Sequence, residues 1–113
     1  MGILDNLPHR CTARRRKRVG DGMGGFVDTF DDVVFTDRSC WRQAASDREV
    51  SWWQQRGTEL TDKFFFNADP IIDENCILEI GGWRYDVISQ ADPDDSAGLG
   101  LLWRVMARRF ERM

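Results

Sequence analysis

The stretch that decides the fold is CILEIGGWRYDVI, residues 76–88. Two runs rich in β-branched, aliphatic and aromatic residues flank the pair Gly81-Gly82, and this arrangement predicts a β-hairpin with a two-residue turn. Because side chains alternate between the two faces of a strand, we expect Trp83, Tyr85 and Val87 to share one face. The hairpin indicates an antiparallel sheet.

Further strands are expected on both sides of this hairpin. Residues 9–17 alternate weakly and predict an edge strand, and residues 26–43 predict one long or two short strands. Residues 58–68 predict a strand with one buried face and a partly covered second face, and residues 91–100 predict an acidic loop. The pattern of residues 101–110 also suits a helix, but we expect a closing strand, because the alternation is regular and a closed sheet needs a last strand to remove its exposed edge.

One short helix is predicted over residues 46–56. Ser46 and Glu49 have the spacing of a capping box, and Gly57 supplies a C-terminal stop. Val50 and Trp53 share a face, so the helix is expected to dock one stripe on the sheet. Trp52 points about 100° away from Trp53, so one of the two is expected in the core and the other at an interface.

Composition limits the function. The chain has 113 residues, which fits a single domain over residues 1–113, with 42% hydrophobic and 31% charged residues and a net charge of -3. Five tryptophans and seven phenylalanines are many for one small core, and they favour contacts with partners. Trp41 and Trp103 are nevertheless expected in the core by alternation, with a contact to a partner as the alternative for either. Three widely spaced cysteines and a single histidine predict neither a disulfide framework nor a zinc site, and they indicate a reducing compartment.

Two neighbouring segments carry the candidate binding residues. Residues 19–25 are rich in glycine and predict a flexible loop. The basic run before it, residues 14–18, can lie beside DNA phosphates, pair with acidic neighbours, or form a solvated face. The loop candidates are Gly20, Asp21, Gly22, Met23, Gly24 and Gly25, and the basic candidates are Arg14, Arg15, Arg16, Lys17 and Arg18.

The order of these elements resembles the head-tail joining, or head-closure, proteins of tailed bacteriophages. Each matching piece is short, and the resemblance depends on their order and spacing over most of the chain. The pieces are residues 7–10 (LPHR), 24–30 (GGFVDTF), 40–46 (CWRQAAS), 61–66 (TDKFFF) and 81–87 (GGWRYDV).

The resemblance implies a small antiparallel β-barrel with one short α-helix and a long Gly-rich loop. It also implies a structural protein of the virion neck, present in the host cytoplasm during assembly, without cofactor, metal or membrane partner. Six or twelve copies would form a ring below the portal, between the portal-side adaptor ring and the tail terminator or tail tube protein. The loop would reach toward the channel that packaged double-stranded DNA crosses. Candidates for contacts between subunits are Trp52, Trp53, Arg108 and Arg109.

The sequence offers little for catalysis, and we expect no enzyme. His9 stands beside a basic run, where a structural or surface role is the simpler interpretation. The acidic residues Asp92, Asp94 and Asp95 lack the spacing of a calcium loop. The main alternative is a barrel that binds single-stranded nucleic acid by stacking bases on aromatic side chains. A small hydrolase is a second alternative.

Overall fold

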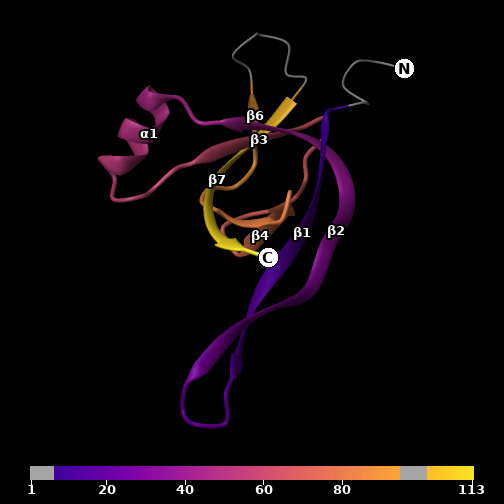
Figure 1. The fold of residues 1–113 in the computed structure, drawn as a ribbon, viewed down its shortest axis with the longest axis vertical. Coiled ribbons are helices and arrows are strands. Elements are labelled where there is room, and N and C mark those ends of the chain that lie inside the picture. Colours follow the sequence, from indigo (N-terminus) through magenta and orange to yellow (C-terminus); the bar gives the residue numbers. More distant parts are fainter. Residues whose placement is uncertain (1–6, 95–101) are drawn as a thin grey trace.

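The computed structural model of the chain describes residues 7–94 and 102–113. Within these residues it contains seven strands and one helix, which Figure 1 shows in order along the chain. The strands are β1 (His9–Gly20), β2 (Phe26–Ala44), β3 (Asp62–Phe66), β4 (Cys76–Ile80), β5 (Trp83–Val87), β6 (Asp92–Asp94) and β7 (Leu102–Arg112), and the helix is α1 (Asp47–Gln54).

The strands form one antiparallel sheet that closes into a ring. Their order is β3-β2-β1-β4-β5-β7-β6, and an additional pairing of β3 with β7 joins the two sides. This confirms the expected mainly β, barrel-like fold with one short helix. The closing strand is confirmed as well, since β7 pairs with β3, β5 and β6.

The hairpin of β4 and β5 is confirmed in register and in turn. Ile80 pairs with Trp83, and both turn glycines have positive φ, 60° at Gly81 and 82° at Gly82. This is the backbone of a type I′ turn, which only glycine and a few other residues adopt easily. Tyr85 and Val87 are buried in the core, and Trp83 packs against it.

The core fills the inside of the ring with aromatic and aliphatic side chains. Phe64 meets Tyr85 edge to face with ring centroids 5.2 Å apart, and Phe66 meets Phe35 in the same way at 5.8 Å. The neighbouring Phe65 points to the other face, where the Trp41 ring lies 5.4 Å away and only 5% of Phe65 remains exposed. The prediction for this strand is therefore confirmed, although β3 is shorter than residues 58–68.

The edge-strand prediction for residues 9–17 is wrong. β1 lies between β2 and β4, and it continues to Gly20, with Val19 paired to Val27 and Gly20 to Phe26. Residues 19 and 20 therefore belong to a strand and not to the loop, and residues 26–43 form one long strand. Because β4 pairs with β1 only as far as Arg15, the rest of the hairpin extends beyond the ring.

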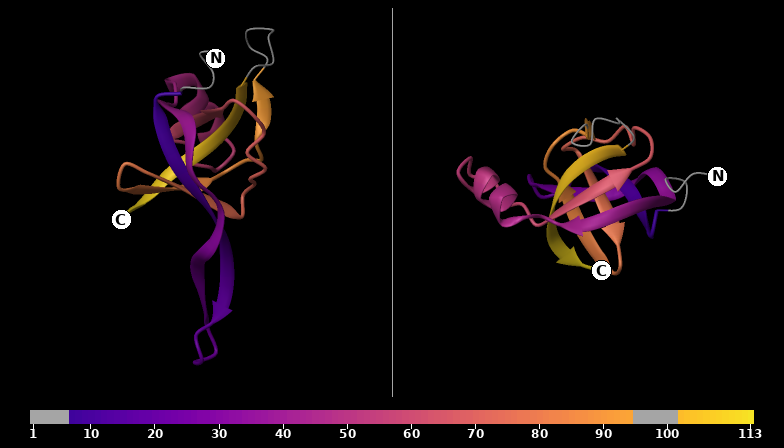
Figure 2. Two further views of the ribbon diagram at one scale, coloured as in Figure 1. Left: turned by 90° about the vertical axis from the view of Figure 1, so that its right-hand side faces the viewer. Right: turned by 90° about the horizontal axis from the view of Figure 1, so that it is seen from above.

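We call residues 16–31 the arm. In Figures 1 and 2 the arm projects from the ring along the longest axis of the molecule, and α1 lies toward the opposite end. The molecule measures 51 Å along that axis and 36 and 22 Å along the other two. The arm is thus a two-stranded ribbon that has left the barrel.

The helix begins as predicted but does not dock. Ser46 Oγ accepts a hydrogen bond from the Glu49 N–H, and the Glu49 carboxylate accepts one from the Ser46 N–H, which completes the capping box. α1 ends at Gln54, and Gly57 follows with a φ of 76°. However, no residue of α1 is buried, so the prediction of a docked stripe is wrong. A sheet that closes on itself fills its inner face with strand side chains and leaves none for a helix to cover.

The core predictions for the tryptophans hold only in part. Neither Trp52, which is 48% exposed, nor Trp53, which is half-buried, reaches the core, because α1 stands off the barrel. Trp41 is 38% exposed, because it lies over Phe65 outside the ring. Trp103 is half-buried and packs against the core. Of the predicted acidic loop, residues 92–94 form β6 and residues 95–100 lie outside the described part of the chain.

Candidate interaction surfaces

The end of the arm is a narrow, ordered turn. The Asp21 carboxylate accepts hydrogen bonds from the backbone N–H groups of Met23 (2.7 Å) and Gly25 (3.0 Å), and the Asp21 N–H donates to the Gly25 carbonyl. Gly22 and Gly24 have φ values of 81° and 85°, which bulkier residues adopt only with strain. Five of the six loop candidates from the sequence, all except Gly20, therefore have defined roles in this turn.

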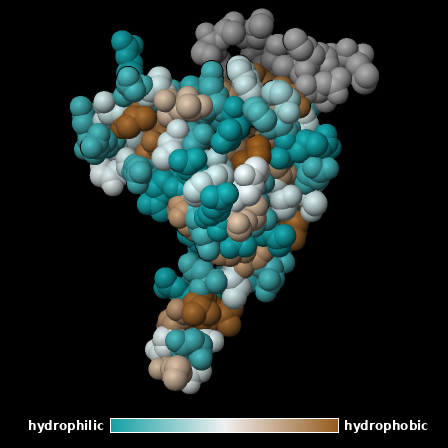
Figure 3. Space-filling model, viewed as in Figure 1, coloured by the Kyte–Doolittle hydropathy of each residue, from teal (hydrophilic) through white to brown (hydrophobic). Residues whose placement is uncertain are grey.

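Apolar side chains cover the end of the arm and remain in solvent. We call residues 19–27 the arm tip. The exposed fractions are 91% for Met23, 68% for Phe26, 49% for Val27 and 45% for Val19. Figure 3 shows this hydrophobic group on the projecting part of the molecule. Val19, Phe26 and Val27 were not predicted as contact residues, although they flank the glycine-rich turn on both sides.

Three cations of the basic run, Arg15, Lys17 and Arg18, form only weak contacts with the facing strand β2. Arg15 and Lys17 both approach the Asp32 carboxylate on the facing strand, at 3.8 and 4.0 Å. Arg18 lies over the Phe26 ring at 5.9 Å from its centroid. All of these groups are largely exposed, so each pair contributes little to stability.

The other two cations of the run, Arg14 and Arg16, bind carboxylates of the β4–β5 hairpin. Arg14 Nε donates to Glu79 at 2.7 Å, and Arg84 Nε donates to the other oxygen of Glu79 at 2.9 Å. Burial opposes the charged form of Glu79, but the two arginines outweigh burial and lower the pKa of its carboxyl group below the ordinary value. Arg14 also donates to the Phe30 carbonyl at 3.1 Å, so it ties both arm strands to the barrel.

A second carboxylate repeats this arrangement nearby. Asp86 accepts a hydrogen bond from Arg16 and another from Arg108, the latter at 2.5 Å. Arg16 also lies 3.6 Å from Asp28 on the facing arm strand. Asp86 therefore joins β7 to the base of the arm through two arginines.

The basic run is thus largely neutralised within the chain. Four of its five cations lie beside carboxylates of the same molecule, and Glu79 and Asp86 are partners that the sequence analysis did not single out. The alternation of polar and apolar residues along residues 76–88 could have indicated that these two carboxylates lie outside the core.

Two of the candidates for contacts between subunits lie on β7. Arg108 is used in the internal pair with Asp86, while Arg109 is exposed and stacks on the Trp83 ring at 4.5 Å.

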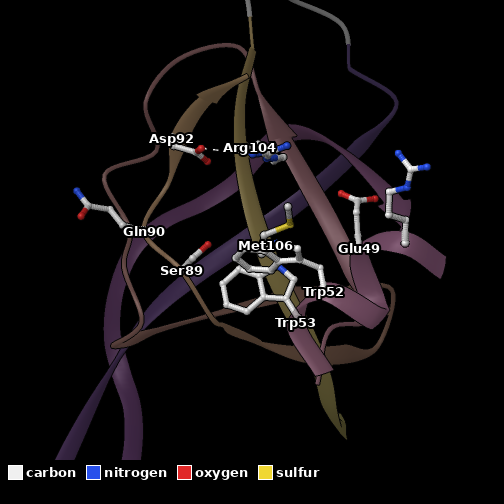
Figure 4. Close-up of a pocket in the computed structure, with 9 residues that line it drawn as sticks. Glu49, Trp52, Trp53, Ser89, Gln90, Asp92, Arg104 and Met106 are labelled. Atoms are coloured by element: carbon white, nitrogen blue, oxygen red, sulfur yellow. Dashed lines mark hydrogen bonds and ion pairs between the residues drawn. The ribbon is translucent and has the colours of Figure 1, made fainter. Parts of the chain in front are cut away.

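A cleft of about 490 Å³ separates α1 from the barrel, and we call it the α1 cleft. Figure 4 shows Trp52 and Trp53 reaching into it from α1, opposite Met106 of β7. The two indole rings meet edge to face at 5.1 Å, and Arg56 stacks on Trp52 at 3.4 Å. The lining residues are Arg48, Glu49, Trp52, Trp53, Ser89, Gln90, Asp92, Arg104 and Met106.

The remaining polar groups have structural roles. His9 Nδ1 accepts the backbone N–H of Arg42 at 3.0 Å, where it supports the pairing of β1 and β2. Within residues 7–94 and 102–113, no group of three His, Cys, Asp or Glu side chains could hold a metal ion. In the same part of the chain, no helix has the length and hydropathy to cross a membrane.

The three cysteines are buried free thiols. Cys11 and Cys40 lie on the adjacent strands β1 and β2. A hydrogen bond from the Cys11 thiol to Cys40, together with burial, raises the pKa of Cys11. Burial also raises the pKa of Cys76. Neither of these two thiols becomes a reactive thiolate at neutral pH in the folded protein.

These features define a class: a small closed antiparallel sheet with a projecting two-stranded arm. The chain is similar in fold to the solution structure of protein SF1141 from Shigella flexneri 2a, with a TM-score of 0.67 and an alignment that covers 96% of each chain. The two sequences are 18% identical, so the likeness shows the fold alone. No known family and no curated protein matches the sequence.

Proposed function

We propose that this chain is a structural protein that joins a bacteriophage head to its tail, as one subunit of a ring below the portal. The ring helps to retain packaged DNA and docks the tail. The observation that carries the proposal is the arm, which leaves a small closed barrel and presents an apolar tip to solvent. A contiguous apolar end on a projecting element is typical of a protein contact and not of a solvated loop.

The charges of the arm support a role beside DNA without tight binding to it. Affinity for phosphates depends on cations that release counterions, and the carboxylates beside Arg14, Arg15, Arg16 and Lys17 reduce that supply. A subunit at the channel wall must let DNA pass during packaging and ejection. Internal pairing of the basic run suits that task better than a continuous positive face.

A complementation experiment tests the proposal. An amber codon is placed early in the gene, in the phage or prophage that encodes it, and lysates are prepared with and without suppression. We expect non-suppressed lysates to contain free tails and heads that have lost DNA, and we expect purified full-length protein to restore infectious particles in vitro. Joined, infectious particles in the non-suppressed lysate would refute the proposal.

The alternative of a single-stranded nucleic-acid module has less support, because the basic run is paired internally. The same purified protein tests it with a fluorescent oligonucleotide. Binding that weakens steeply with salt, with failure of complementation, would favour the alternative.

A further inference from the structure

Two apolar surfaces of this chain have no partner among the described residues. One is the arm tip with Met23 and Phe26, and the other is the α1 cleft with Trp52, Trp53 and Met106. Figures 1 and 2 place them toward opposite ends of the long axis, so they cannot meet within one molecule. Two unlike surfaces on one chain that fit each other give a heterologous contact, which repeats from copy to copy.

The α1 cleft leaves apolar side chains of α1 incompletely packed. A helix of eight residues is marginal in water unless it packs against something, and α1 has no buried residue. Its two indole rings contact each other and Arg56 and leave the space toward Met106 open. Further burial of these rings would stabilise both the helix and its contact.

The arm tip has the shape to enter such a space. Gly22 and Gly24 carry no side chain and have open surroundings, so Met23 stands alone at the end of the ribbon. Met is flexible and polarisable, and it makes favourable contacts with aromatic rings. A methionine packed against the tryptophan rings is therefore a good apolar anchor.

The charges of the two surfaces are complementary. Asp21, at the tip, is exposed and forms no ion pair with any cation of the described residues. Arg48, at the rim of the α1 cleft, likewise forms no ion pair with a carboxylate in the described part of the chain. A contact between copies would bring an unpaired acid to an unpaired base.

We propose that the arm tip of one copy occupies the α1 cleft of a second copy, with Met23 between Trp52 and Met106 and with Asp21 beside Arg48. This contact deepens the proposed function, since it names the surfaces through which ring subunits associate.

Photo-crosslinking of the purified full-length protein tests the contact. Benzoylphenylalanine replaces Met23, the protein is irradiated up to its solubility limit, and crosslinked peptides are identified by mass spectrometry. We expect intermolecular crosslinks to residues 48–56 or 104–106. Crosslinks confined to other regions, or no intermolecular product, would overturn the contact.

Sedimentation gives an independent measure with a matched control. We expect Met23→Asp to weaken self-association about tenfold or more, because it places a charge in an apolar contact. Ile71→Asp is the control, because Ile71 is 77% exposed and belongs to neither surface. Equal effects of the two variants would contradict the proposal. Far-ultraviolet circular dichroism verifies that each variant folds.

A double-mutant cycle tests the charge pair. Asp21→Asn keeps an acceptor for the turn and removes the charge, and Arg48→Gln removes the opposite charge. Each should weaken association about two- to fivefold, and the double variant should be no weaker than either single variant. Additive effects would refute the pairing.

The two proposals can fail separately. If complementation fails while these crosslinks appear, the head-tail function is wrong and the contact stands. If complementation succeeds and the crosslinks do not appear, only the contact is refuted.

Discussion

Glu79 accepts hydrogen bonds from Arg14 at the base of the arm and from Arg84 on the neighbouring strand. Replacing it by Gln keeps the size of the side chain and removes the charge that holds both guanidinium groups. The Glu79 side chain is 10% exposed, and those of Arg14 and Arg84 are 32% and 28% exposed. At this exposure we take about 1 kcal/mol for each charge-assisted hydrogen bond, or about 2 kcal/mol for Glu79→Gln.

Urea denaturation followed by tryptophan fluorescence measures this change. In a domain of this size, about 2 kcal/mol corresponds to a fall in Tm of about 8 °C. The control is Glu111→Gln, because Glu111 forms an ion pair with Arg84 alone among the described residues, at 3.2 Å, and its side chain is 47% exposed. We expect the control to lose less than about 0.5 kcal/mol. A loss of less than about 0.5 kcal/mol for Glu79→Gln, or an equal loss in both variants, would refute the reasoning.

The same variant has a signature in pH. The arginines lower the pKa of Glu79 in the folded protein, so its carboxylate stabilises the fold at pH values above about 4.3, the ordinary value of an unfolded glutamate. That contribution is lost as the pH falls through the folded-state pKa. The difference between the wild-type protein and Glu79→Gln should therefore be full at pH 7 and shrink on acidification. A difference that stays constant down to pH 2 would show that the charge is not its cause.

Three further predictions concern other parts of the fold. Ser46→Ala removes the capping-box hydroxyl and should lower the free energy of unfolding by at most about 1 kcal/mol in urea titrations, while Ser51→Ala, in mid-helix, should change it little. Phe64→Ala leaves a cavity inside the ring and should cost about 3–5 kcal/mol, measured by thermal unfolding; a loss below about 1 kcal/mol would contradict the position of Phe64 in the core. The thiols of Cys11 and Cys76 should react with Ellman's reagent only in denaturant, whereas rapid reaction in buffer would contradict their burial.

The strand pattern could be predicted from the sequence because each signal was local. The glycine pair of the β4–β5 hairpin, the capping box at Ser46 and the alternation of residues 101–110 each specify structure within a few residues. The position of β1 was not local. Whether a strand lies at an edge depends on which distant strand pairs with it, and the pairing with β4 spans more than sixty residues of sequence.

The surroundings of the candidate contact residues could be predicted only in part, for a related reason. The basic run suggested a positive face, but Asp28 and Asp32 come to lie opposite it only in the register of the long hairpin. The helical pattern of Val50 and Trp53 suggested docking, but closure of the sheet left no face for a helix. Both errors arise because the sequence gives the character of a side chain and not the partner that the fold brings to it.

The hairpin at residues 76–88 positions the arm as well as the core. Its inward residues, among them Tyr85 and Val87, fill the ring, whereas Glu79 and Asp86 bind Arg14 and Arg16 outside it. An isolated two-stranded ribbon is marginally stable in water and has no fixed direction of its own. Because these two carboxylates hold both arginines at the base, the barrel determines where the arm points. The Asp86→Asn and Glu79→Gln double variant should therefore keep its core and release the arm, seen as faster hydrogen exchange in residues 16–31 than in β3. Unchanged exchange in the arm would show that pairing between its own strands is sufficient.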